Sequence, residues 1–598
     1  MKMKVSDYIA DFFVKKGITH VFGVVGGGAM HLNDSFGHHP QMHCTYNHHE
    51  QASAMAAEAY ARIAGKPAIV CVTSGPGAIN ALNGVAGAYQ DSIPMLIVSG
   101  QMKTANLVRT SGLDLRTLGG QEFDITHAVG DMTKYAELVL DPQRIAFVLE
   151  KAYAIATTGR QGPCWVDVPV DIQGKSIETD DLQHYRLPVY PEADYTKLAA
   201  SVADGLMHAE RPVIYAGNGI RWAGAAELLP ALAKRYGASV VTCWDSIDLM
   251  ATDSRYYCGR GGTMGDRAGN FAVQNSDYLL CLGARLSIYQ VGYDVHTWAR
   301  AAYVVDVDID PEELRKKIIH VDLPLCGDAG AFMKALLAAD GAAKRHDVWI
   351  NQCNAWKKTY PVVQQRQYEE TEKANVYAFI DTLSRMLPED NITVVTNGSA
   401  SVVGSQTYYI KQGDRFLMNC GISSMGYGLP ASVGASIAAG NGDVVCIEGD
   451  GSIMMNLQEL QTIVTNELPV KIFIINNEGY HQPRQTERNF FVGKLVGVGP
   501  ESGDLGFPDY GKVATAFGMP YVRIGSNAEL EDGIAKTLAT ERYAICEVFV
   551  TTTQKFEPKN LAKKLPDGTI VSPPLEDMAP FLPREELAKN MFVPLVDE

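Results

Sequence analysis

The chain has 598 residues, 46% hydrophobic content and a formal net charge of −16 with no long basic run. It is therefore long enough for three or four domains, and nucleic acid or an anionic membrane is excluded as an expected partner. Its 11 cysteines form no CxxC pairs, which favours reduced thiols over a disulfide framework or zinc site. The N-terminal residues lack the apolar core of a signal peptide, and no membrane-length apolar run follows, so we expect a cytoplasmic protein.

The first α/β pattern, expected over residues 1–175, presents a glutamate at the end of a strand. A strand is predicted over Met42–Tyr46, and Glu50 opens a helix with small apolar residues on one face. Such a carboxylate is either an ordinary first-turn residue stabilised by the helix dipole or a proton partner for a cofactor. Val72-Thr73-Ser74-Gly75-Pro76-Gly77 and Asp91-Ser92-Ile93-Pro94-Met95 follow within the same domain.

A polar linker then leads to a second α/β domain, expected over residues 195–343. It opens with Pro212–Gly219, an apolar strand that runs into glycines, and it closes after the strand at 304–310. Gly261-Gly262-Thr263 and Gly283-Ala284-Arg285 lie between them. A strand, a glycine turn and a helix are what a dinucleotide site needs, yet many middle domains keep this shape and bind nothing.

The third domain, expected over residues 374–551, contains the most specific motif. The apolar run Val444–Ile447 leads to Gly449-Asp450-Gly451, and 24 residues later Asn476-Asn477 ends a second strand at 470–475. We predict that the two strands are parallel neighbours, so that Asp450 and Asn477 meet in one crevice. Mg²⁺ prefers hard oxygen ligands and takes few of them from protein, so these side chains and the Gly479 carbonyl would suffice beside a diphosphate.

Together these motifs resemble thiamine diphosphate enzymes, and the segments 449–459 and 468–477 look like the large subunit of the acetolactate synthase group. The resemblance covers about the first 550 residues and implies three doubly wound parallel-sheet α/β domains. It implies that Glu50 meets the diphosphate half across a subunit interface, in a homodimer or homotetramer. It also implies that Asp450, Asn477 and the Gly479 carbonyl hold Mg²⁺. The thiamine diphosphate contacts that it implies further are Gly27, Ser74, Pro76, Asn80, Gly398, Ser399, Ser423, Met425, Gly449, Gly451, Ser452 and Tyr480.

Two cofactor details follow from the resemblance. Met425 aligns with the bulky side chain that lies under the bend of the cofactor, although most methionines are plain core residues. The second domain is expected to hold FAD, and Ser287-Ile288-Tyr289 departs from the acidic pair usual in the family. The FAD contacts implied are Gly217, Gly219, Thr263, Arg285 and Asp308.

Departures from the family bear on the substrate. Gly120 stands where an aromatic ring precedes Gln121-Glu122 in the family, and Thr486 stands where the family usually places Trp. Both changes open volume, and the nearby side chains of His481, Gln482, Arg484 and Gln485 add hydrogen-bond donors. We interpret this as a larger and more polar acceptor, such as a keto-sugar; a merely solvated loop is the alternative.

The expected reaction is decarboxylation of a 2-oxo acid, pyruvate first among them, and transfer of the acyl unit to a ketone. Glu50 is predicted to activate the cofactor, and Gln121, His481 and Gln482 to handle substrate protons or oxygens, although a histidine of this kind is often structural. A simple 2-oxo acid decarboxylase, a lyase or hydrolase of a cyclic diketone, and a regulatory protein without turnover are the alternatives. The tail, residues 552–598, is predicted to be extended, as a lid over the site or packed on a neighbouring subunit.

Overall fold

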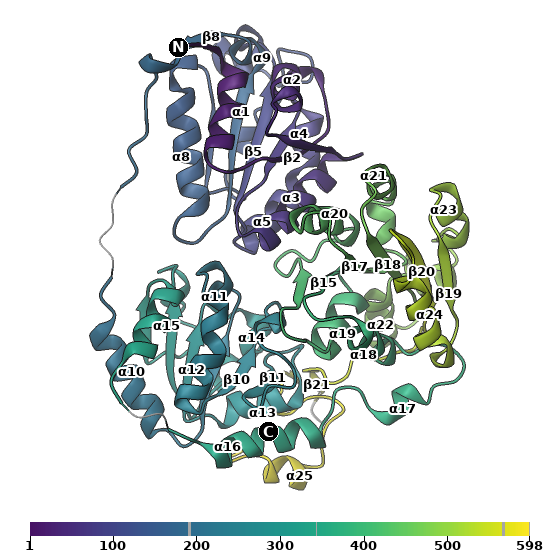
Figure 1. Ribbon diagram of the computed structural model, residues 1–598. Coiled ribbons are helices and arrows are strands. Elements are labelled where there is room, and N and C mark those ends of the chain that lie inside the picture. Colours follow the sequence, from purple (N-terminus) through teal and green to yellow (C-terminus); the bar gives the residue numbers. More distant parts are fainter. Residues whose placement is uncertain (189–192, 342–343, 565–567, 597–598) are drawn as a thin grey trace.

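The computed structural model of the chain contains three α/β domains, each built on a sheet of six parallel strands with helices on its faces (Figure 1). This confirms the expected fold class. The structure describes residues 1–188, 193–341, 344–564 and 568–596, so the expected end of the second domain at residue 343 lies outside the described residues. In this described part of the chain, no helix is long and apolar enough to cross a membrane.

The inner strands of the N-terminal sheet are short and almost fully buried, because helices cover both faces of the sheet, whereas its two edge strands are partly exposed. The predicted strand before Glu50 is present as β3 (His43–Tyr46), and the helix after it as α3 (Glu50–Ala64). Other helices of this domain are α1 (Val5–Lys15), α2 (Met30–His38), α4 (Pro76–Asn80), α5 (Leu82–Gln90) and α8 (Ile145–Thr157). The strand order is β3 (His43–Tyr46), β2 (His20–Gly23), β4 (Ile69–Val72), β5 (Met95–Gln101), β7 (Pro163–Pro169) and β6 (Tyr135–Leu138).

The C-terminal sheet has the same connectivity as the N-terminal one, with its first strand between the second and the third. The predicted neighbours β17 (Val444–Gly449) and β18 (Val470–Asn476) are parallel, with Gly449 opposite Ile475, which confirms that the two turns share one edge. The helices that position the site are α19 (Ser399–Thr407), α20 (Gly428–Ala438), α21 (Glu459–Thr465) and α22 (His481–Phe490). The strand order is β16 (Arg415–Met418), β15 (Ile392–Val395), β17 (Val444–Gly449), β18 (Val470–Asn476), β20 (Ala544–Phe549) and β19 (Tyr521–Ile524).

The central sheet has a different order, in which the direction of connection reverses between β9 (Pro212–Ala216) and β12 (Tyr278–Leu282). Ligands of open α/β sheets bind at such a switch point, beyond the carboxyl ends of the strands. Helices α11 (Gly219–Trp222), α13 (Arg267–Asn275), α15 (Ala329–Ala338) and α16 (Asp347–Thr359) flank this sheet. The strand order is β11 (Tyr257–Arg260), β10 (Ser239–Thr242), β9 (Pro212–Ala216), β12 (Tyr278–Leu282), β13 (Tyr303–Asp308) and β14 (Leu323–Cys326).

The N-terminal and C-terminal domains share one hydrophobic core, formed where α3 packs against α20. A buried charge cluster lies at the same contact: the Arg62 guanidinium pairs with Glu58 and Asp91, and the Tyr427 hydroxyl donates to Glu58 at 2.6 Å. These contacts hold the two domains of one chain together, as Figure 1 shows for α3 and α20.

The C-terminal tail packs on the central domain of its own chain, beside α16 (Figure 1). It carries the short strands β21 (Lys563–Lys564) and β22 (Ile570–Val571) and the helix α25 (Arg584–Lys589). Leu575 and Leu587 join the core of the central domain, and Gln274 donates to Glu576 at 2.6 Å. These contacts hold this part of the tail against the central sheet of its own chain, and the predicted lid and the packing on a neighbouring subunit stay predictions.

Candidate functional site

Glu50 lies at the carboxyl edge of the first sheet, where α3 begins directly after the loop that follows β3. Its side chain is buried, with 8% exposure, and its Oε2 accepts a hydrogen bond from Asn80 Nδ2 at 2.9 Å. Asn80 ends α4, the short helix that starts at Pro76. The structure therefore brings three of the predicted residues, Glu50, Pro76 and Asn80, to one edge of the first sheet.

The loops after β2 and β4 lie next to this carboxylate. Ser74 is buried, and its hydroxyl has no hydrogen-bond partner among the described residues. The Gly28 amide donates to Thr73 Oγ1 at 3.0 Å, which brings Gly27 to the same edge. Gln121 is exposed and adopts a left-handed backbone conformation, and its carbonyl touches the turn at Gly75. An unpaired buried hydroxyl at this edge is what a polar ligand ring would satisfy.

The second half of the site lies where β17 and β18 end in the third sheet. Asp450 is 1% exposed, and its two carboxylate oxygens accept from the amides of Gly451 at 2.9 Å and Gly479 at 2.8 Å. Tyr510 donates to the Asp450 carbonyl. Burial raises the pKa of Asp450 to about 7, because desolvation disfavours the charged carboxylate.

The hydrogen bonds of Asn477 indicate whether a metal ion fits here. Its Nδ2 donates to Ser399 Oγ at 3.3 Å, whereas its Oδ1 is buried without any partner among the described residues. That free amide oxygen, the Asp450 carboxylate and the Gly479 carbonyl are oxygen donors of the kind that Mg²⁺ takes. Among the described residues no group of three or more His, Cys, Asp or Glu is placed to hold a metal, so a site here depends on these mixed donors.

The remaining cofactor residues of the third domain surround this pair. Ser452 Oγ accepts from the Gly426 amide at 2.8 Å and lies 2.6 Å from Thr396 Oγ1, which ties the loop bearing Met425 to the turn at Asp450. Met425 is half-buried, and the Tyr480 ring lies close to Gly451. Gly398 precedes α19, and Ser423 has a left-handed conformation, with its carbonyl accepting from Asn397.

Helix α22 carries residues that were predicted for the substrate pocket. His481 is buried and donates from Nε2 to the Gln554 carbonyl at 2.6 Å, and Gln485 donates to the same carbonyl. Burial also lowers the pKa of His481, which keeps the ring neutral. These contacts make His481 and Gln485 anchors for the segment around Gln554. Gln482 and Thr486, one turn apart on another face, are less buried.

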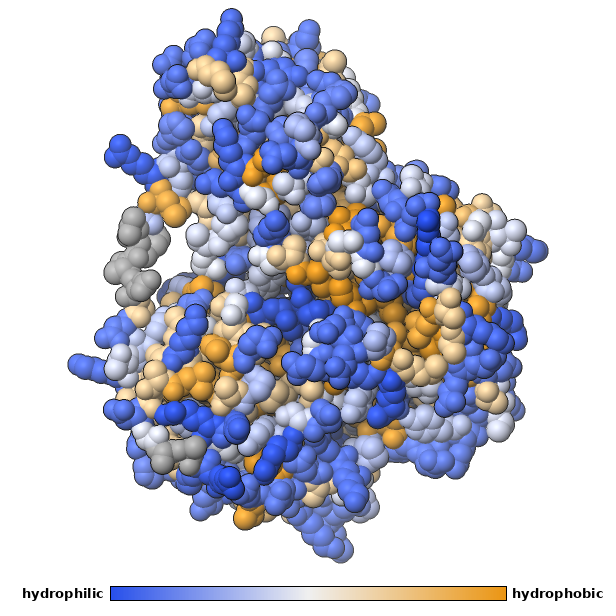
Figure 2. Space-filling view, viewed as in Figure 1, coloured by the Kyte–Doolittle hydropathy of each residue, from blue (hydrophilic) through white to orange (hydrophobic). Residues whose placement is uncertain are grey.

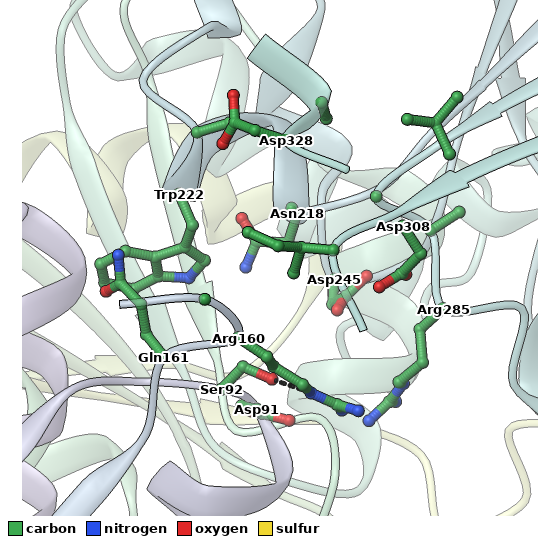
Figure 3. A pocket seen from close by; sticks show the side chains of 18 of the residues that line it. Asp91, Ser92, Arg160, Gln161, Asn218, Trp222, Asp245, Arg285, Asp308 and Asp328 are labelled. Atoms are coloured by element: carbon green, nitrogen blue, oxygen red, sulfur yellow. Dashed lines mark hydrogen bonds between the residues drawn. The ribbon is translucent and has the colours of Figure 1, made fainter. Parts of the chain in front are cut away.

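A separate cavity of about 240 Å³ lies between the N-terminal and central domains (Figure 3). It is found at the switch point of the central sheet, beyond β9, β12 and β13. Arg160 and Arg285 extend into the same part of it, and Arg160 donates to Ser92 at 2.9 Å (Figure 3). Asp245 faces this cavity with a buried Oδ1 that has no partner among the described residues.

Three of the five residues predicted for FAD line this cavity, namely Gly219, Arg285 and Asp308. Gly217 and Thr263 do not. Gly217 instead packs on the neighbouring glycine turn, where a Cβ would lie 2.2 Å from the Gly283 carbonyl oxygen. Thr263 donates its amide to the Tyr289 carbonyl at 2.8 Å. Arg160 and Gln161 were missed, because no local sequence signal connects the first domain with this turn, and Trp222 at the end of α11 was missed as well.

Each half of the predicted thiamine site makes its hydrogen bonds within its own domain. The side chain of Glu50 is bonded within its own domain, and the Asp450 carboxylate is bonded within the third domain. Figure 2 shows hydrophobic side chains gathered on the visible face between these domains. Exposed hydrophobic residues close in sequence to the two halves are Tyr46, Ile79, Ile422, Met454 and Met455.

Comparisons with known proteins match each of the three domains of the chain. Family models match residues 3–127 (thiamine pyrophosphate enzyme, N-terminal TPP binding domain), 199–336 (central domain) and 396–548 (C-terminal TPP binding domain). The chain is similar to acetolactate synthase 1, chloroplastic, from Zea mays, with 31% identity over 92% of this chain and 85% of that protein. It is equally similar to the acetolactate synthase isozyme 2 large subunit of Escherichia coli (strain K12), with 31% identity over 94% of this chain and 98% of that protein.

Proposed function

The chain belongs to the thiamine pyrophosphate enzyme family as an acetolactate synthase-like member, and we propose that it decarboxylates pyruvate and transfers the two-carbon acyl unit to a ketone acceptor of the sugar type. The observation that carries the proposal is the buried Glu50 carboxylate, held by Asn80 at 2.9 Å at the end of a strand. When bound, thiamine diphosphate supplies the carbon nucleophile and the electron sink for this chemistry.

The protein's own residues bind the cofactor and move its protons. Glu50 would exchange a proton with the pyrimidine ring, since its carboxylate is buried and, among the described residues, only its Oε2 is hydrogen-bonded. Asp450, Asn477 and the Gly479 carbonyl would hold Mg²⁺ against the diphosphate. The free Asn477 Oδ1 supports that assignment. Ser74 and Met425 would contact the cofactor's rings.

The proposal of a sugar acceptor is supported by the open space around Gly120. A Cβ at Gly120 would meet no atom within 4 Å, and Gly120 is exposed beside Gln121. His481 and Gln485 are hydrogen-bonded to the Gln554 carbonyl. Gln482 does not share that contact, so it remains as a polar side chain of α22. A keto-sugar has the volume and the hydroxyl groups to use such a site.

We also propose that the cavity at the central switch point holds FAD and that two chains assemble into a dimer. Asp308 ends a strand beside the glycine turns, where a carboxylate can accept from ribose hydroxyls, and Arg160 and Arg285 can meet a diphosphate. A second copy would bring Glu50 of one chain to the metal loop of the other and cover the exposed hydrophobic residues of that face.

The deciding experiment is pyruvate turnover by purified protein with thiamine diphosphate and Mg²⁺, with and without a panel of keto-sugars, and with products identified by mass. A pyruvate-derived acyl unit on a sugar supports the proposal. Acetolactate from pyruvate alone would instead indicate a conventional synthase. Acetaldehyde regardless of acceptor would indicate a simple decarboxylase, and both results would overturn the sugar acceptor.

A further inference from the structure

Arg484 is the largest charged side chain buried next to the proposed metal loop. Its exposure is 0%, and its guanidinium donates from Nη1 to the Asn477 carbonyl at 2.8 Å and from Nη2 to the Glu478 carbonyl at 2.5 Å. We propose that Arg484 is a positioning residue that fixes the backbone of residues 477–479 for Mg²⁺ and diphosphate binding. The inference rests on the metal site proposed above.

The loop adopts a backbone that needs external support. Glu478 has φ 58° and Gly479 has φ 122°, both in the left-handed region that disfavours a side chain. At Gly479 a Cβ would lie 2.1 Å from the Val498 carbonyl oxygen, so this position requires glycine. The strand β18 ends at Asn476, whose carbonyl still accepts from the Val550 amide at 2.9 Å, so the carbonyls of Asn477 and Glu478 lie beyond the ladder. The planar fork of an arginine can bind two such carbonyls at once and so fix two peptide planes.

The same loop is fixed from its other side by groups already described. The Gly479 amide donates to Asp450 Oδ2 at 2.8 Å, and the Tyr480 amide donates to the Val498 carbonyl at 2.8 Å. Arg484 therefore binds the carbonyl oxygens of Asn477 and Glu478, while the Gly479 amide of the same loop binds the Asp450 carboxylate. These contacts together fix both the carbonyls and the amides of residues 477–480.

Arg484 acts on the loop without reaching a substrate, because its side chain has no exposed surface. Its remaining partner is weak: Nε lies 3.3 Å from Glu501 Oε2 but lacks hydrogen-bond geometry. Arg488, one turn further along α22, binds the other oxygen of Glu501 at 2.5 Å and is 37% exposed. Arg488 thus shares the carboxylate but has no hydrogen bond to the loop carbonyls, which makes it the matched control.

The test is a calorimetric titration of Mg²⁺ into protein that contains excess thiamine diphosphate, without substrate, for wild type, R484M, R484K and R488M. Groups that orient a metal site from outside its ligands typically change affinity by about 10–100-fold. We expect R484M to raise the Mg²⁺ dissociation constant by about that factor, and R484K by less, because an ammonium can hold one carbonyl only. R488M should stay within about twofold of wild type.

Thermal unfolding without Mg²⁺ separates positioning from stability. If R484M lowers the midpoint of unfolding but leaves the Mg²⁺ dissociation constant within about twofold, Arg484 is only structural and the inference is overturned. If R484M does not fold, an R484K protein with wild-type Mg²⁺ affinity overturns it equally. A wild-type protein that binds no Mg²⁺ with thiamine diphosphate would instead overturn the proposed metal site itself.

Discussion

Asn47 and Glu459 are 412 positions apart in the chain, and Asn47 Nδ2 donates to Glu459 Oε2 at 2.9 Å. The other carboxylate oxygen of Glu459 accepts from the His48 amide at 3.0 Å. Glu459 is fully buried at the start of α21 in the third domain. The loop that leads into Glu50 is therefore held by the C-terminal domain of the same chain.

Replacing Glu459 with alanine should weaken both stability and turnover. The Asn47 amide and the His48 N–H would lose their acceptor, and an unsatisfied buried donor costs about 1–3 kcal/mol. A loosened loop misplaces Glu50, so we expect kcat to fall by about 10-fold or more. Thermal unfolding and steady-state kinetics measure this. Glu467→Ala is the control, because that exposed residue pairs only with Arg542 among the ion pairs described; equal behaviour of the two variants would refute the interpretation.

Glu50→Gln should abolish most turnover while the fold is kept. The amide has the same shape but cannot exchange a proton, and proton transfer of this kind contributes about 10²–10⁴-fold to a rate. We expect kcat to fall within that range, with thiamine diphosphate still bound. Glu150→Gln is the control, because Glu150 belongs to the outer helix α8 and accepts from the Tyr185 amide at 2.7 Å. Wild-type turnover by Glu50→Gln would sink the proposed mechanism.

Gly120→Phe should discriminate between acceptors. The new ring would occupy space that is now open around Gly120, so we expect turnover with a keto-sugar to fall by at least about 10-fold, while turnover with pyruvate alone is kept. Thr486→Trp, which refills the second opened position, should act in the same direction. Product ratios measured with both acceptors present test this. An equal loss for both acceptors would mean that Gly120 does not contribute to acceptor choice.

Asp308→Asn should reduce flavin binding without changing thiamine diphosphate binding. The change keeps the shape at the end of β13 but removes the charged acceptor for ribose hydroxyls, and such hydrogen bonds contribute about 1.5–3 kcal/mol. We expect at least about a 10-fold lower flavin affinity, measured by fluorescence titration of flavin-stripped protein. Asp253→Asn, an exposed residue outside the cavity, is the control. If wild-type protein binds no flavin at all, the FAD proposal itself is wrong.

Asp306→Asn should change how stability depends on pH. Burial raises the pKa of Asp306 to about 7, and its Oδ1 has no partner among the described residues. The folded state therefore prefers the protonated carboxyl, so its contribution to stability is complete below about pH 4 and is lost as the pH rises to about 7. At pH 8 we expect the variant to unfold at least about 2 °C higher than wild type, and at pH 4 no higher. A parallel pH dependence of the two proteins would contradict this.

The local chemistry of the metal loop could be predicted from the sequence. Two apolar runs separated by one short helix must form neighbouring parallel strands, so Asp450 and Asn477 were expected at one edge, and β17 and β18 place them there. Glu50 was likewise predictable, since it follows a strand and opens a helix. These conclusions depend on the short-range hydrophobic periodicity of the chain, which indicates where strands end and so which residues lie at the same edge of a sheet.

The sequence by itself thus determined the fold class, the family and the residues at each strand end. Only the tertiary structure decided which of those residues have free polar atoms: Asn477 keeps an unpaired Oδ1, whereas His481, predicted for proton handling, is committed to Gln554. It also showed that Arg160 of the first domain enters the central cavity and that Glu459 holds the loop before Glu50. The physical reason is that contacts between residues hundreds of positions apart depend on how whole domains pack, which leaves no periodic trace in the chain.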